Sequence, residues 1–367
     1  MRFIRRHIFR PIIILLLIII PVVMFGKAGF SFTFTPSKTD YSNVLRDGVV
    51  DGSSRIVDIA MLGAHDAFSD KITTNSPIDP AEPEDSLLRN QTLGKVADGV
   101  FVRLSRAQKS NAETLLKAGV RYFDVRISYY ENEWYTKHGL ISDKLSRYLS
   151  DIIKFLGDNP GEFIIFDIQH VHFGDTVGFS ELFDYLQTYQ ISNVAITDFI
   201  NYDPLSLQPR DLTYDIVTDT GAKAGLVILA KTPASASLPY HYNRGNGDTQ
   251  VINIRSLWHN TADTDTLIEG IQSEYEYLSN TVIYEDIFRV NQAQKTGVLS
   301  GDDLWDTVFG WSLLDMANNS NAALIAHEDF LDWLTKMPIL MVDYADSTKG
   351  DFNKVANDAM ITYNNAL

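Results

Sequence analysis

The chain has 367 residues, and its 47 acidic against 31 basic side chains give a formal net charge of −16. This surplus of negative charge disfavours a nucleic-acid partner, because nucleic acids are bound largely through attraction to their phosphates. With 45% hydrophobic and 21% charged residues, the composition is that of a globular protein with a sizeable core. Cysteine is absent, which excludes disulfides, thiolate catalysis and metal sites built on cysteine.

Residues 1–28 predict an export signal or a membrane anchor. Four arginines precede an unbroken apolar run at 11–25, PIIILLLIIIPVVMF. A helix of that length reaches about 22 Å, short of the roughly 30 Å hydrocarbon core, which favours a cleaved signal peptide over a spanning anchor. An uncleaved anchor would keep its arginine-rich end in the cytoplasm. In either case we expect the acidic body to be exported, either secreted or tethered at its N-terminus outside the cytoplasm.

The rest of the chain predicts a linker followed by one α/β domain. Residues 29–50 are polar without a clear period, which indicates a linker, and the proline-rich, acidic stretch 73–94 is typical of a surface loop. Beyond the linker, short apolar and β-branched segments alternate with helical patterns. Strands are predicted at 56–62, 122–128, 134–137, 163–169, 225–230, 251–254, 282–290 and 339–342, and helices at 111–118, 142–156, 179–189 and 264–278. Eight strands alternating with helices favour a (β/α) barrel of the TIM type over residues 51–367, as a single catalytic domain.

Ionisable residues follow or interrupt the predicted strands at positions that a parallel barrel would bring to one end. The clusters are His65-Asp66, Asp124-x-Arg126, His138-Gly139, Asp167-x-x-His170 and Asp343. Each alone has an ordinary explanation, such as a hydrogen-bonded loop histidine or a structural ion pair. Five at the end where barrels carry their catalytic residues are harder to explain in that way, because buried charges are costly unless they are paired or functional.

Two histidines, one arginine and several carboxylates suit attack on a phosphodiester by a hydroxyl group or by water. One imidazole can remove the proton from the attacking oxygen and the other can protonate the departing oxygen, since both titrate near neutral pH. An arginine can stabilise the charge on the phosphate oxygens, and a carboxylate can hold an imidazole in the required tautomer. This chemistry needs no metal.

These residues lie in segments that resemble the X-region blocks of phosphatidylinositol-specific phospholipase C-like phosphodiesterases. The segments are MLGAHDAFS (61–69), RAQKSNAETLLKAGVRYFDVRIS (106–128), WYTKHGL (134–140) and FLGDNPGEFIIFDIQH (155–170). Later segments, SLWHNTADTDTLIEGI (256–271), VNQAQKTG (290–297) and PILMVDYAD (338–346), resemble that family's later blocks. The resemblance implies a distorted (β/α) barrel and a phosphoric diester hydrolase or phosphorus–oxygen lyase, closest to the metal-independent bacterial-type branch.

The resemblance also implies roles for the residues. His65 would be the general base, oriented by Asp343, and His138 the general acid, assisted by Asp124. Family members cleave inositol phospholipids by attack of the inositol 2-hydroxyl, giving diacylglycerol and a cyclic inositol phosphate.

Asp66 and Arg126 would bind the reacting groups. The resemblance places Asp66 beside a phosphoryl oxygen and the attacking hydroxyl, and Arg126 against the phosphate. The calcium-dependent branch of the family has an oxygen ligand where this chain has Arg126, and a fixed cation there repels a metal ion. We therefore expect no cofactor, although Asp66, Asp124 and Asp167 still offer oxygen atoms to Ca²⁺.

Substrate contacts are expected from four further residues. By resemblance, Lys231 falls at a basic substrate contact and Asp286 near an inositol-binding acid, while Gln169 and His170 replace a more basic and acidic pair. An exposed loop lysine and a turn aspartate are equally good explanations of the first two. Late aromatic residues such as Trp258 would meet a membrane surface if they form a rim, although core packing is the more common role of such residues. No protein partner is indicated.

Two other functions stay open on the sequence. Related barrels let water attack glycerophosphodiesters or sphingomyelin-like lipids with the help of a metal ion, which loss of activity in chelator would indicate. A catalytically inactive barrel that binds a phosphorylated head group is the third reading, and the presence of both His65 and His138 argues against it.

Overall fold

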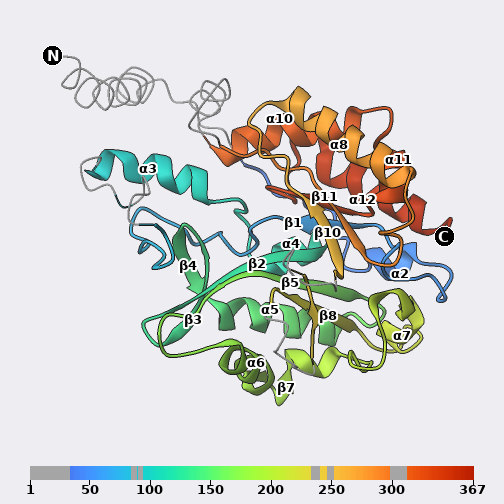
Figure 1. Cartoon of the computed structure of the whole chain (residues 1–367), viewed down its shortest axis with the longest axis horizontal. Helices are drawn as coiled ribbons and strands as arrows, with labels where there is room; N and C mark the ends of the chain where they lie inside the picture. Colours follow the sequence, from blue (N-terminus) through green and yellow to red (C-terminus); the bar gives the residue numbers. More distant parts are fainter. Residues whose placement is uncertain (1–33, 84–88, 90–93, 233–239, 246–251, 298–311) are drawn as a thin grey trace.

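The computed structural model describes residues 34–83, 89, 94–232, 240–245, 252–297 and 312–367. Eight parallel strands curl around a common axis in the order β10, β11, β12, β1, β2, β5, β8, β9, with helices outside (Figure 1). The strands are β1 (Met61–Ala64), β2 (Val120–Tyr130), β5 (Phe163–His172), β8 (Gly225–Ala230), β9 (Tyr242–Asn243), β10 (Ile254–Leu257), β11 (Phe288–Gln292) and β12 (Ile339–Val342). The predicted (β/α) barrel is confirmed.

The barrel is interrupted between β9 and β10. No backbone ladder joins these two strands among the described residues, and the link is a side-chain bond in which the Asn253 amide donates to the Asn243 carbonyl at 2.8 Å. The strand β9 has only two residues, too few for a periodic pattern, which is why the sequence did not predict it. The barrel is therefore distorted.

One predicted barrel strand was wrong. The segment 134–137 lies in β3 (Glu133–His138), which runs antiparallel to the end of β2 and pairs on its other side with β4 (Leu140–Lys144). Its short alternating pattern is the same for a hairpin arm and for a barrel strand, and only the pairing distinguishes them. The hairpin extends from the barrel end where β2 finishes, and it carries His138 there.

The four predicted helices are present, with ends that differ by a few residues: α4 (Ala112–Lys117), α5 (Leu145–Asp158), α6 (Phe179–Thr188) and α8 (Thr264–Ser279). The apolar stripe of α5 is buried as expected. Helices that the sequence did not predict are α2 (Val44–Gly48), α3 (Gly94–Ser105), α7 (Tyr214–Thr218), α10 (Leu313–Ala326), α11 (Phe330–Lys336) and α12 (Phe352–Asn364). Short elements complete the connections: β6 (Gln190–Ile191), β7 (Val194–Ala195), η3 (Ile196–Phe199), η4 (Pro209–Asp211) and η5 (Lys349–Asp351).

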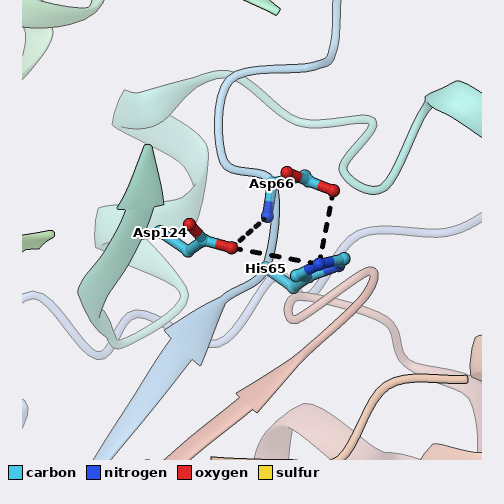
Figure 2. Close-up of side chains that lie close together, drawn as sticks. All are labelled: His65, Asp66 and Asp124. Atoms are coloured by element: carbon cyan, nitrogen blue, oxygen red, sulfur yellow. Dashed lines mark hydrogen bonds and ion pairs between the residues drawn. The ribbon is translucent and has the colours of Figure 1, made fainter. Parts of the chain in front are cut away.

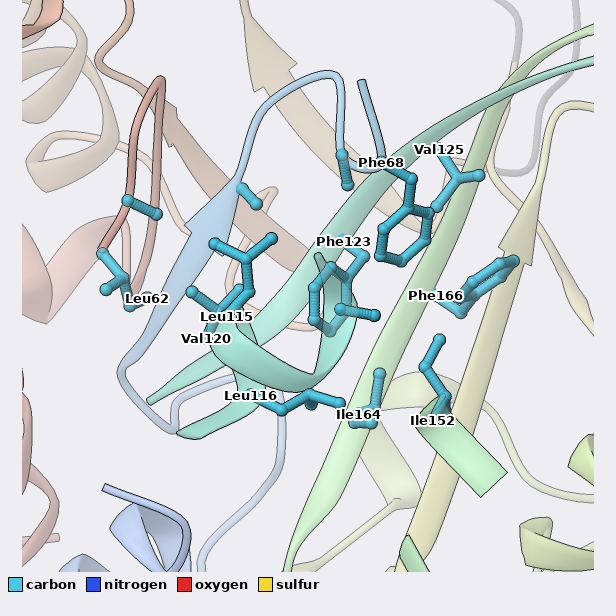
Figure 3. Packing of buried hydrophobic residues seen from close by; sticks show 14 of the residues in the cluster. Leu62, Phe68, Leu115, Leu116, Val120, Phe123, Val125, Ile152, Ile164 and Phe166 are labelled. Atoms are coloured by element: carbon cyan, nitrogen blue, oxygen red, sulfur yellow. The ribbon is translucent and has the colours of Figure 1, made fainter. Parts of the chain in front are cut away.

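Alternation along each strand divides the core into two clusters. Side chains such as Leu62, Phe123 and Phe166 point outward and pack under the helices (Figure 3). Their neighbours, such as Met61 and Tyr122, belong to the second cluster, inside the barrel. Because side chains alternate along a strand, every second residue points into the barrel. Toward the carboxyl ends of the strands these interior side chains change from apolar to polar.

Part of the predicted linker is packed against the barrel. Tyr41 and Leu45 are buried, and the carbonyl of Tyr41 accepts a hydrogen bond from the Arg121 guanidinium at 3.1 Å. Arg121 forms a fully buried ion pair with Glu162 at 2.6 Å, and Glu162 in turn accepts from the backbone of Arg46. The expectation of a linker is thus wrong for residues 41–49, because their apolar residues are too scattered to show a period and their partners lie far along the chain.

Residues 1–28, predicted as signal or anchor, lie outside the described residues. Within the described part, no helix combines the length and the apolar character that crossing a membrane requires.

Candidate active site

The six residues predicted as catalytic converge at one end of the barrel. His65 and Asp66 directly follow β1, and Asp124 and Arg126 are two residues apart on β2. The backbone of Asp66 is left-handed, with φ of 40°, a conformation that aspartate adopts more readily than most residues. His138 ends β3 and Asp343 follows β12, so side chains from four strands meet. Figure 2 shows the carboxylates of Asp66 and Asp124 beside His65.

His65 is held from behind by a buried carboxylate. Its Nδ1 lies 2.7 Å from Oδ1 of Asp343, which is 1% exposed. Its Nε2 points toward the centre of the site, 3.3 Å from Oδ2 of Asp66 and 3.4 Å from a terminal nitrogen of Arg126. This is the placement that the sequence predicted for an imidazole oriented by Asp343.

Asp66 is the centre of the cluster. Its buried carboxylate pairs with the Arg126 guanidinium and lies 3.0 Å from Nε2 of His138. The ring centroids of His65 and His138 are 6.2 Å apart, and the Nε2 atoms of both rings face the same carboxylate oxygen, Oδ2 of Asp66. Two potential proton carriers and one cation thus all contact a single buried carboxylate.

The place of Asp124 differs from the expectation. Sequence resemblance assigned it to assist His138, whereas its Oδ2 accepts from the backbone N–H of Asp66 at 3.3 Å and lies 3.9 Å from Nε2 of His65. The reason is the strand geometry: Asp124 lies on β2 beside β1, while His138 is carried outward on the hairpin and meets Asp66 instead. Asp124 therefore acts on His65 and on the turn after β1.

The charges of the site perturb its pKa values strongly. Burial alone would lower the pKa of His65, but the carboxylates of Asp66 and Asp343 outweigh it and raise that pKa to about 9. Burial, together with the neighbouring charges of Arg126 and His65, lowers the pKa of His138 to about 4 even though Asp66 opposes it. Burial raises the pKa of Asp124 to about 6.

The hydrogen bonds of His138 oppose this low pKa. Its Nδ1 lies 3.0 Å from the carbonyl of Ser105, and its Nε2 faces the carboxylate of Asp66. Two oxygen acceptors can be satisfied together only by a ring that carries both protons. A phosphate anion beside Arg126 would offset the guanidinium charge, and it would therefore raise the pKa of His138 toward the protonated form that a general acid needs.

The same residues can be tested as a metal site. His65, Asp66 and Asp124 each offer a ligand atom, and these atoms lie within 4.8 Å of one another. Asp66 is already paired with Arg126, whose guanidinium also approaches Nε2 of His65. A divalent ion would have to displace this fixed cation, so the donor set fits a metal poorly.

Of the four predicted substrate contacts, three lie at the catalytic end. Lys231 is exposed directly after β8, and Gln169 and His170 are near the end of β5, where an irregularity in register precedes the pairing of Arg126 with His170. Burial is the main cause that lowers the pKa of His170, and the charge of Lys137 lowers it further.

The fourth, Asp286, is at the opposite end of the barrel. The strand β11 begins at Phe288 instead of at residue 282, so Asp286 precedes the strand and lies at its amino end. Its carboxylate is exposed and pairs there with Arg55 at 2.8 Å. The prediction of an inositol contact at Asp286 was wrong. It relied on a strand that begins at residue 282, whereas the apolar residues 282 and 283 are exposed and precede the strand.

Two further features of the site were missed. The side chain of Gln108, fully buried, donates to the carbonyls of His65 and Val342 at 3.0 and 2.9 Å and accepts from the backbone of Ala345, which ties the ends of β1 and β12 together. Below the site, Arg244 donates to both carboxylate oxygens of Asp167. Neither residue stands at the end of a predicted strand, so no pattern indicated it.

Known proteins resemble part of this chain in sequence, and solved structures resemble most of it in fold. No family model matches the chain. "PI-PLC X domain-containing protein 3" of Bos taurus is 36% identical over 121 residues, 32% of this chain and 38% of that protein. "Variant-surface-glycoprotein phospholipase C" of Trypanosoma cruzi is 32% identical over 133 residues, 34% of this chain and 35% of the relative. The chain thus spans less than half the length of these curated relatives.

Solved structures match more of the chain. A phosphatidylinositol-specific phospholipase C from Staphylococcus aureus aligns with a TM-score of 0.61 at 15% identity, covering 89% of this chain and 99% of the other. The corresponding enzyme from Listeria monocytogenes gives a TM-score of 0.55 at 17% identity, covering 88% and 98%. At such identities the likeness shows the fold.

Proposed function

We propose that the chain, which is similar over about a third of its length to phosphatidylinositol-specific phospholipase C-like proteins of the X-region type, is a phosphodiesterase that releases the head group of a phospholipid. The observation that carries the proposal is that His65 and His138 both direct Nε2 at the Asp66–Arg126 pair. A protein that only binds a phosphate has use for the arginine, but it has no use for two imidazoles placed to move protons.

In the proposed reaction the attacking oxygen is the 2-hydroxyl of an inositol head group. Its proton passes to Nε2 of His65 as the oxygen bonds to phosphorus, while Asp343 stabilises the imidazolium that forms. Arg126 balances the charge that grows on the phosphate oxygens. His138 donates its proton to the glycerol oxygen as the bond from phosphorus to that oxygen breaks. The products are diacylglycerol and a cyclic inositol phosphate.

The shifts in pKa favour the reverse of the protonation pattern that this reaction uses. The raised pKa of His65, about 9, favours its imidazolium form, and the lowered pKa of His138, about 4, favours its neutral ring, which its two oxygen acceptors oppose. The dependence of kcat/KM on pH is bell-shaped in either case, whether His65 is the base and His138 the acid or the roles are exchanged. Phosphate binding shifts His138 toward its active form, and the assignment of roles needs a test other than a pH profile.

Replacement of the leaving group separates the two roles. A nitrophenyl inositol phosphate releases a phenolate that needs no proton, so His138→Ala should lose far less activity on this substrate than on phosphatidylinositol. His65→Ala should lose about two to four orders of magnitude on both substrates. Selective rescue of the His65 variant instead would reverse the roles.

Phosphorus NMR of the full chain with phosphatidylinositol micelles, with and without excess EDTA, tests the reaction itself. We expect a cyclic inositol phosphate that survives EDTA and vanishes in His65→Ala. His327→Asn is the control, since this histidine stacks on Trp333 in the helical layer and should leave turnover unchanged. Turnover that EDTA abolishes would favour a metal-dependent attack by water, and head-group binding without turnover would favour an inactive barrel.

We further propose that the barrel is exported and works at a membrane surface. The apolar run at 11–25 behind four arginines supports export, and a lipid substrate supports a membrane surface as the place of work. Trp258, which is 55% exposed just after β10, is a candidate for contact with lipid. Cell fractionation, with N-terminal sequencing of the mature protein, tests this proposal, and a barrel found only in the cytoplasm would contradict it.

A further inference from the structure

Residues 77–79, which lie in the proline-rich stretch predicted as a surface loop, pack against the hairpin of β3 and β4. An isolated antiparallel bridge joins Ile78 to Leu140 at the start of β4. The backbone of Ile141 donates to the carbonyl of Pro77 at 2.8 Å, and the backbone of Asp79 donates to the carbonyl of Gly139 at 3.0 Å. The loop therefore braces the turn immediately after His138.

The side chain of Asp79 is directed into the protein. It is fully buried, and its Oδ2 lies 2.5 Å from Nζ of Lys137, which is 8% exposed. Its Oδ1 accepts a hydrogen bond from the hydroxyl of Ser128 at 3.0 Å. A buried ion pair of this kind seldom adds stability over an apolar pair of similar size, so stability alone is a weak reason for one to lie here.

The partners of Asp79 flank the proposed reacting groups on both strands. Lys137 precedes His138 on β3, and Gly139, whose φ of 67° favours glycine, follows it. Ser128 is two residues beyond Arg126 on β2, on the same face of that strand. One carboxylate thus connects the strand of the phosphate-binding arginine with the strand of the proposed general acid.

We propose that Asp79 is a positioning residue of this site: it holds His138 at the correct distance from Arg126 by clamping Lys137, Ser128 and the Gly139 turn. The inference rests on the proposed two-histidine reaction. Asp79 touches no reacting atom. It acts by fixing the hairpin, and a small displacement of an acid from its leaving group costs a large part of the rate.

Three variants of the full chain test the role on phosphatidylinositol micelles. Asp79→Asn keeps the shape but leaves Lys137 without its partner, and we expect kcat to fall by about tenfold or more with KM within threefold. The double variant Asp79→Asn with Lys137→Met removes both charges, so its melting temperature should recover while kcat stays low. Recovery of kcat together with the melting temperature would show that Asp79 only neutralises Lys137, and it would overturn the proposal.

A control breaks a partly buried ion pair outside the site. Glu274 on α8 pairs with Arg255 at 2.5 Å on the outer side of the barrel, and Glu274→Gln should lower the melting temperature without lowering kcat. An equal loss of kcat in this control would mean that the effect follows lost stability, and the proposal would fail.

A spectroscopic readout separates this proposal from the proposed function. The His138 imidazole, identified by its loss in His138→Ala, should shift or broaden in a carbon–proton NMR spectrum of Asp79→Asn and stay unchanged in Glu274→Gln. An unmoved His138 signal in Asp79→Asn overturns the positioning role whatever the kinetics. A moved signal in a protein whose wild type cleaves no phosphatidylinositol keeps the clamp on His138 and removes the proposed substrate.

Discussion

Replacing Asp343 by Asn tests how the site controls its proposed base. The pKa of His65 is raised from 6.5 to about 9. Burial lowers this pKa, but the charges of Asp66 and Asp343 raise it by more. That difference corresponds to about 3 kcal/mol of preference for the imidazolium. Asp343→Asn keeps the size of the side chain but removes one of the three carboxylate charges that raise this pKa, and it leaves a neutral acceptor in place of a charged one. We therefore expect the pKa of His65 to fall by about one to two units.

The shift also predicts how stability depends on pH. A histidine whose pKa is raised by folding stabilises the folded state fully below its ordinary value of 6.5, and this contribution is lost as pH rises through about 9. The variant should have less of this contribution. The difference in melting temperature between wild type and Asp343→Asn should therefore be largest below pH 6.5 and should narrow toward pH 9.

Carbon–proton NMR of protein labelled at the histidine rings measures the titration directly, with His65 assigned by its absence in His65→Ala. Activity provides a second reading: kcat should fall by about two orders of magnitude, because the imidazole loses the group that orients it and stabilises its charge. Asp286→Asn is the matched control at the far end of the barrel. A His65 midpoint unchanged within 0.3 units, taken here as about the error of such a titration, would refute the assignment of its pKa to these carboxylates.

Four further outcomes are expected. Asp124→Asn should raise the melting temperature at pH 8, because a buried carboxyl with its pKa raised to about 6 is destabilising when ionised. The variant should also have a lower kcat, and an unchanged or lower melting temperature would contradict this interpretation. Gln108→Leu should cost about 1–3 kcal/mol in urea unfolding, since it leaves the His65 and Val342 carbonyls unpaired, and a stable, fully active variant would argue against the tie. Excess EDTA should leave turnover within twofold while Arg126→Ala abolishes it, and the opposite pattern would indicate a metal. Asp286→Ala should leave KM unchanged, because its carboxylate lies at the amino end of β11, so a raised KM would place substrate there after all.

Much of the fold was predictable because its signals are local. The strand at 225–230 and the stripe of α5 were read from adjacent letters, and both are buried as expected. Local patterns did not distinguish the hairpin arm β3 from a barrel strand, nor did they find β9, since a two-residue strand exists only through its partner β8. Residues 41–49 were read as linker for the same reason, because their burial depends on Arg121 and Glu162 far along the chain.

The candidate site was likewise predictable only in part. His65, Asp66, Asp124, Arg126 and Asp343 were predictable from the sequence, because parallel strands bring their carboxyl ends to one side whatever the details of packing. His138 was expected at the same end on a barrel strand, whereas the antiparallel arm β3 carries it there. Which carboxylate meets which imidazole was not predictable, since that depends on the path of the hairpin: Asp66, not Asp124, contacts His138. The sequence alone determined the barrel and the residue types at the carboxyl ends of its strands. Only the tertiary structure decided the pairing of charges and the inward turn of Asp79, because contacts between residues far apart in the chain leave no period in the sequence to read.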